Sequence, residues 1–123
     1  IAVFWWDKSA LWGNAQAQYN LGLAYKMGMG TLQNHEKAAT WFKKAAEQGN
    51  ARAQYSLGVA YGTGNGVSQD LVYAHMWFNI ATTNGEESAR GALNLTTKTM
   101  KPWQLKKAQE LAEDCVSKNY KGC

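Results

Sequence analysis

The sequence has little of what defines several large classes of protein. Charged residues make up only 18% of the 123 residues, and intrinsically disordered chains usually carry more. No segment approaches the roughly 20 apolar residues that a membrane-spanning helix needs. The net charge of +4 is mild, and acidic residues alternate with the late lysines, unlike the dense basic stripe of a nucleic-acid-binding protein. We therefore expect one globular domain with no membrane span and no nucleic-acid partner.

Histidine and cysteine are scarce, with two of each. His35-Glu36 begins like the zinc motif H-E-x-x-H, but Ala39 stands where the second histidine is required. His75 has no His, Cys or Asp at ligand spacing, so both histidines are interpreted as packing or surface residues. We expect no metal and no cofactor.

Familiar catalytic motifs are also missing. The sequence contains no G-x-S-x-G and no S-x-x-K, the usual settings of a serine nucleophile. The glycine-rich segment Gly62–Gly66 resembles a phosphate-binding loop, but no strand precedes it and Gln69 replaces the third glycine. It is interpreted as a turn between helices, and no enzymatic activity is expected.

What the sequence does contain is a repeat. AQAQYNLG, starting at Ala15, returns as ARAQYSLG, starting at Ala51, and further identities follow at the same spacing up to Gly49 and Gly85. A fixed period between 20 and 50 residues indicates a protein built from stacked structural repeats.

Each repeat predicts two helices. Apolar residues at i, i+4, i+7 and i+8 form one face of the first helix: Ala17, Leu21, Ala24 and Tyr25. Gly28 and Gly30 end it, and Asn34 is placed to cap the next helix. The second apolar stripe ends at Gly49 and comprises Ala38, Trp41, Phe42, Ala45 and Ala46.

Gly22 and its repeat partner Gly58 lie inside predicted helices, where glycine costs about 1 kcal/mol relative to alanine. A packing reason is therefore needed. We predict that a Trp or Phe of the partner helix fills the space over each glycine.

The later part of the chain diverges from the repeat. Asp70 is placed to cap a helix over Leu71–Thr83, and Ala89 and Leu93 begin a third copy that then fades. Pro102 suits the first turn of a final helix, predicted from Trp103 to about Asn119. Its apolar stripe would cover the end of the core and comprises Leu105, Ala108, Leu111, Ala112 and Cys115.

Residues 1–13 align with the second helix of a repeat whose first helix is not in the sequence. The aromatic side chains there would then lack a partner surface on one side: Phe4, Trp5, Trp6 and Trp12. Such a patch indicates either an interaction edge, through which copies could assemble, or an artificial cut. The cut is the favoured interpretation.

The pattern A-x-A-Q-Y-x-L-G-x-A-Y, followed by G-x-G, Q-(D/N), W-F and a closing Gly, resembles Sel1-like repeats, which are relatives of tetratricopeptide repeats. The resemblance covers residues 1–97 and implies a right-handed α-solenoid, all-α, that binds proteins or peptides, often in bacterial envelopes. The expected division is residues 1–13, 14–49, 50–85, a degenerate copy at 86–97, and a cap helix with tail at 98–123.

Similarity to tetratricopeptide repeats places the binding residues on the concave face, lined by the first helix of each repeat. The candidates are Gln16, Tyr19, Leu23, Lys26, Met27, Arg52, Tyr55, Val59, Thr63, Ser88, Gly91, Leu95 and Lys98. Lys26, Arg52 and Lys98 make this face mildly basic, so an acidic segment or a free carboxylate is the expected partner. Tyr19 and Tyr55 could equally pack between repeats.

Cys115 and Cys123 are eight positions apart, about 12 Å along a continuous helix, which is too far for a disulfide. A helix end at Ser117–Asn119 and the flexible Gly122 would let the tail fold back and form one; two free thiols are the alternative. A bridge would indicate an oxidising compartment, the bacterial periplasm or beyond. Free thiols would favour the cytoplasm.

Two other functions remain open. Cysteine-rich relatives are described as β-lactamases or penicillin-binding proteins, which suggests a hydrolase acting on cell-wall or β-lactam substrates. Those relatives carry a disulfide in each repeat, however, and this chain does not. The other possibility is a self-assembling structural piece.

Overall fold

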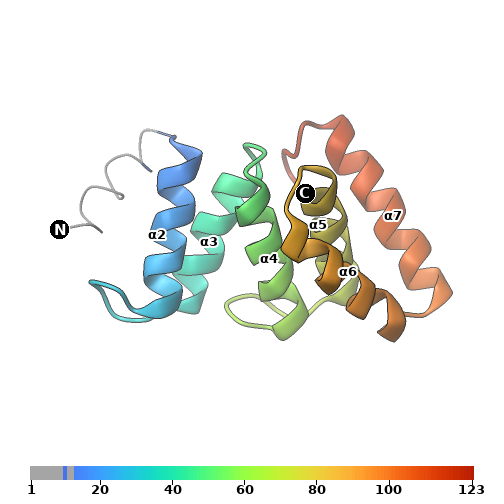
Figure 1. Cartoon of the computed structure of the whole chain (residues 1–123), viewed down its shortest axis with the longest axis horizontal. Coiled ribbons are helices and arrows are strands. Elements are labelled where there is room, and N and C mark those ends of the chain that lie inside the picture. The colour runs from blue at the N-terminus through green and yellow to red at the C-terminus, as the bar shows by residue number, and fades with distance from the viewer. Residues whose placement is uncertain (1–9, 11–12) are drawn as a thin grey trace.

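The computed structural model describes Ala10 and residues 13–123, so the expectations about Phe4, Trp5, Trp6 and Trp12 lie outside the described residues. The described part of the chain is all-helical, as predicted, and its helices follow one another along the long axis of the molecule (Figure 1). They are α2 (Ala15–Met27), α3 (His35–Ala46), α4 (Ala51–Thr63), α5 (Leu71–Thr83), α6 (Glu87–Thr99) and α7 (Pro102–Ser117).

Asx caps start the helices of both complete repeats. The predicted caps are confirmed: Asn34 accepts a hydrogen bond from the backbone N–H of Lys37 at 3.0 Å, and Asp70 accepts from Tyr73 at 3.1 Å. Asn14 and Asn50 start α2 and α4 in the same way. The first helices end at Gly28 and Gly64, with φ of 72° and 79°, a conformation that glycine adopts without a Cβ penalty.

Within each repeat the two helices pack along their length, α2 on α3 and α4 on α5, while α3–α4 and α5–α6 contacts join successive repeats. The glycines allow this close approach. A Cβ at Gly22 would lie 2.6 Å from Phe42, and a Cβ at Gly58 would lie 2.7 Å from Phe78. The predicted aromatic partner is confirmed, and it is phenylalanine in both repeats.

The C-terminal unit departs from this arrangement. Helices α6 and α7 both pack on α5 but contact each other marginally at most. Helix α7 ends at Ser117, within the helix end predicted at Ser117–Asn119, because Asn119 and Tyr120 adopt positive φ of 57° and 68°. Lysine has no acceptor with which to cap α7; instead Gln104 Oε1 accepts a hydrogen bond from the backbone N–H of Lys101 at 2.8 Å.

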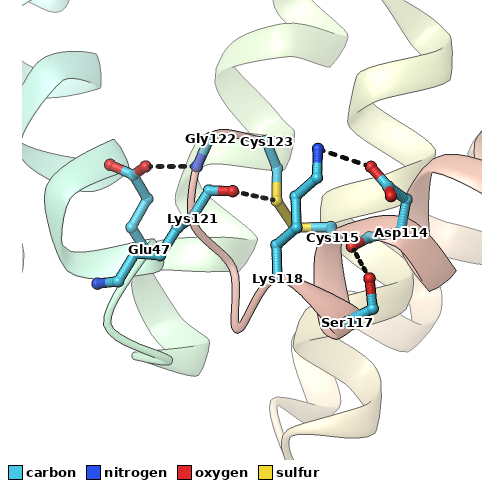
Figure 2. A network of polar contacts seen from close by, with 8 residues as sticks. All are labelled: Glu47, Asp114, Cys115, Ser117, Lys118, Lys121, Gly122 and Cys123. Atoms are coloured by element: carbon cyan, nitrogen blue, oxygen red, sulfur yellow. Dashed lines mark hydrogen bonds and ion pairs between the residues drawn. A yellow bond between two sulfur atoms is a disulfide. The ribbon is translucent and has the colours of Figure 1, made fainter.

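Residues 118–123 form a tail that turns back toward the first complete repeat (Figure 2). The sulfur atoms of Cys115 and Cys123 are joined in a disulfide, with their Cα atoms 5.5 Å apart. The backbone N–H of Gly122 donates to Glu47 Oε2 at 3.1 Å. The C-terminal end of the tail is therefore attached both to α7 and to the residue that follows α3.

Candidate peptide-binding face

Buried glutamines set the relative position of successive repeats. Gln54, which is fully buried, donates to the carbonyl oxygen of Ala46 at 3.1 Å and accepts from Asn84 Nδ2 at 2.9 Å. One repeat earlier, Gln18 donates to the carbonyl of Ala10 at 3.1 Å and accepts from Gln48 at 2.8 Å. Each glutamine therefore ties the first helix of its repeat to the preceding repeat.

The burial of these two glutamines was not among the predictions from the sequence. The signal was present, because Gln18 and Gln54 lie one residue after Ala17 and Ala53 and three residues before Leu21 and Leu57. That spacing puts a polar residue on an otherwise apolar stripe. Buried polar side chains are nearly always hydrogen-bonded, so the pattern predicts a structural polar contact.

A loop contact also holds the repeats in register. Gly66 has a φ of 84°, and a Cβ there would collide with the carbonyl oxygen of His35 at the start of α3. The loop after α4 can therefore lie directly on the preceding repeat. An open hollow between the two inter-helix loops results, lined by Gln33, Asn34, His35, Glu36, Gly64, Gly66, Val67 and Ser68.

Most of the candidate binding residues lie on the surface of α2, α4 and α6. We call the surface formed by the candidate residues on these three helices the first-helix face. Met27 and Leu95 are 64% and 67% exposed, which is high for apolar side chains. The polar members of the set and Gly91 are also exposed: Gln16, Lys26, Arg52, Thr63, Ser88 and Lys98.

The remaining four candidates are half-buried and contribute to packing. The ring of Tyr19 lies 5.8 Å from that of Phe42, and Tyr55 lies 5.9 Å from Phe78, both tilted at 41°. Leu23 and Val59 pack against the core at equivalent positions. Each tyrosine thus packs on the second helix of its own repeat and keeps part of its surface in solvent.

The charges on the first-helix face are mostly unopposed. Arg52 Nε lies 4.0 Å from Glu86 Oε2, a long contact at an exposed site, where ion pairs contribute little. Neither Lys26 nor Lys98 forms an ion pair with any residue that the structure describes. The face therefore presents three exposed cations, with Lys26 and Lys98 near the C-terminal ends of α2 and α6 and Arg52 near the N-terminal end of α4.

His75 lies in the core, between α5 and α6. Thr97 donates its hydroxyl proton to the carbonyl of Leu93 at 2.8 Å, so at 3.1 Å its oxygen accepts from Nε2 of His75. Burial lowers the pKa of His75 below the usual 6.5, because a charged imidazole is poorly solvated there. His75 is thus a neutral packing residue, and no group of three metal-ligating side chains occurs within the described ranges.

Helix pairs joined in this way define the chain as an α-solenoid. The family model described as Sel1 repeat matches residues 15–50 and 51–86. The two matches cover more than half of the chain, which belongs to the Sel1 repeat family. No curated protein sequence is significantly similar to it.

Solved structures agree with this fold. A protective antigen present in uropathogenic Escherichia coli strains, described as displaying an SLR fold, matches with a TM-score of 0.91 and 36% identity over 96% of this chain. A Sel1 repeat protein from Oxalobacter formigenes matches with a TM-score of 0.77 and 29% identity over 92%. The chain spans 26% of the first protein and 54% of the second.

Proposed function

We propose that this chain is a non-catalytic protein- or peptide-binding module that uses the first-helix face. The observation that carries the proposal is the recurrence of exposed side chains at equivalent positions of successive first helices, Gln16 and Arg52 in the complete repeats and Ser88 on α6. Solenoids of the Sel1 type are in general protein-interaction scaffolds, because stacked repeats create one extended surface. Polar side chains at repeat spacing can contact an extended segment at regular intervals.

The charges favour an acidic partner. Lys26, Arg52 and Lys98 are exposed on α2, α4 and α6, the first helices of successive repeat units, and arginine binds carboxylates through two parallel hydrogen bonds. Met27 and Leu95 add apolar surface beside these cations. The best ligand for the face is therefore a segment that combines carboxylates with apolar side chains.

The disulfide supports an oxidising location, such as the bacterial periplasm or the outside of the cell. No helix among the described residues is long and apolar enough to cross a bilayer. A binding partner is therefore best sought among envelope, secreted or host proteins.

A random-peptide display library, selected on the immobilised chain, tests the proposal. Enriched peptides should contain Asp or Glu, and Arg52→Glu should weaken their binding at least about tenfold, or 1.4 kcal/mol. Arg90→Glu is the matched control, because Arg90 is an exposed arginine that pairs with Glu87 on α6 and is not among the candidate residues. Equal binding by the Arg52→Glu and Arg90→Glu variants would refute the site.

A further inference from the structure

A second concave region lies between α5 and α7, away from the first-helix face. Its volume is about 560 Å³, within the roughly 300–1,000 Å³ range of ligand sites. Ile80 on α5 and Ala112 on α7 are its buried apolar residues. It lies beside α5, on which α6 and α7 both pack without forming a helix pair of their own. We call this hollow the cap cleft.

The cap cleft is lined by neutral side chains and one carboxylate. Asn79 and Gln109 contribute side-chain amides, and Glu113 is the only charged side chain among the described residues that line it. Within the described part of the chain, these three side chains form no hydrogen bond or ion pair. The carboxylate of Glu113 therefore has no cationic partner there, although the whole chain carries a net charge of +4. Amides both donate and accept, so they match the peptide groups of an extended segment.

One end of the cap cleft is built by the tail. The hydroxyl of Tyr120 lies 3.2 Å from Asn84 Nδ2, and both residues line the cleft. The disulfide at Cys115 and Cys123 brackets Tyr120 and holds it there. Tyr120 of the tail thus adds an aromatic side chain to a lining that otherwise comes from α5, Asn84 and α7.

We propose that the cap cleft binds an extended basic peptide segment, with a lysine or arginine head on Glu113. Long basic side chains lay their methylene stems along apolar surface while the charged head stays solvated. Val116 is 53% exposed and lies on α7 one turn beyond Glu113, where such a stem would pack. The preference is opposite to that of the first-helix face, so the two sites would hold segments of opposite charge.

Nuclear magnetic resonance with two synthetic peptides tests this proposal. The ¹⁵N-labelled chain is titrated with acetyl-Ala-Leu-Lys-Ala-Ala-amide and with the same peptide carrying Glu in place of Lys. We expect the lysine peptide to shift the amide signals of Asn79, Thr83, Gln109, Glu113 and Tyr120, and the glutamate peptide to leave them in place. Signals that stay unmoved with both peptides would overturn the proposal.

Two matched variants test whether the carboxylate of Glu113 is the group that binds the lysine head. Glu113→Gln should weaken binding of the lysine peptide at least about tenfold. Glu110→Gln removes the same charge from an exposed position of α7 outside the cap cleft, and should bind as wild type does. Equal losses in both variants would show nonspecific attraction and refute the site. Arg52→Glu should leave lysine-peptide binding unchanged, so failure of the first-helix face and failure of the cap cleft give different results.

Discussion

The ring of Phe78 occupies the space that a side chain at Gly58 would need. A Cβ at Gly58 would lie 2.7 Å from both Cδ1 and Cε1 of that ring, and Phe78 is itself 4% exposed within the core. The ring therefore cannot move without disturbing Ala74, Ala81 and Ala89 around it. The same relationship between Phe42 and Gly22 shows that it belongs to the repeat.

We predict that Gly58→Ala destabilises the protein, although alanine is the better helix former. Overpacking costs about 1–3 kcal/mol and outweighs the roughly 1 kcal/mol gained in helix propensity. Gly91→Ala on α6 is the control, because a Cβ at Gly91 meets no atom within 4 Å, so that variant should be more stable. Urea denaturation measures both, and a stabilised Gly58→Ala variant would contradict the packing argument.

Gln54→Leu should cost about 1–3 kcal/mol, because it removes two interior hydrogen bonds, the one from Gln54 to the carbonyl of Ala46 and the one from Asn84 to Gln54. Gln69→Leu provides the comparison. Gln69 also donates to a carbonyl, that of Gly62 at 2.9 Å, but at an exposed site where water can replace it, so the expected loss is below about 0.5 kcal/mol. If chemical denaturation gives similar losses for the two variants, the buried glutamine does not hold the repeats together.

The disulfide can be tested by alkylation under denaturing, non-reducing conditions, on protein from its native compartment. Intact mass should show no label on Cys115 or Cys123. Two labels would mean free thiols and would move the expected location to the cytoplasm. Replacing both cysteines with alanine should cost about 2–3 kcal/mol of stability, the loop-closure value for so short a loop.

The free energy of unfolding should decrease as the pH is lowered, and protonation of His75 should account for part of this decrease. Because burial depresses its folded-state pKa below 6.5, the unfolded chain takes up the proton first. The stabilisation is therefore complete above about pH 6.5 and is lost as the pH falls toward the folded-state pKa. Denaturation at neutral and mildly acidic pH should show a smaller pH effect for His75→Gln than for wild type. His35→Gln, at the first turn of α3, controls for losing a histidine elsewhere, and an unchanged slope in His75→Gln would contradict the prediction.

The helices could be predicted from sequence because local chemistry determines them. Asn34, Asp70 and Gly28 mark helix ends through backbone hydrogen bonds and φ angles that few residues satisfy. An aromatic ring over Gly22 could be predicted because a glycine inside the apolar face of a helix needs a packing reason, and Phe42 provides that ring. The binding face was drawn from family resemblance, and its role is still a prediction.

The position of the C-terminal tail could not be predicted in the same way. Asn119 and Tyr120 end α7 in a conformation that non-glycine residues seldom adopt. The contact of Gly122 with Glu47 joins residues 75 positions apart, and no local pattern encodes it. The cap cleft follows from the placement of α7 against α5, which depends on the packing of the whole core.

The tail contact with Glu47 changes how the solenoid should come apart. In a simple repeat array each unit touches only its neighbours, so the ends fray independently of the middle. Here the tail links α7 to the end of α3, and Tyr120 also packs on Gly49. Residues from Glu47 to Cys123 should therefore open as one cooperative unit, with matching rates of hydrogen exchange in α4, α5 and α7.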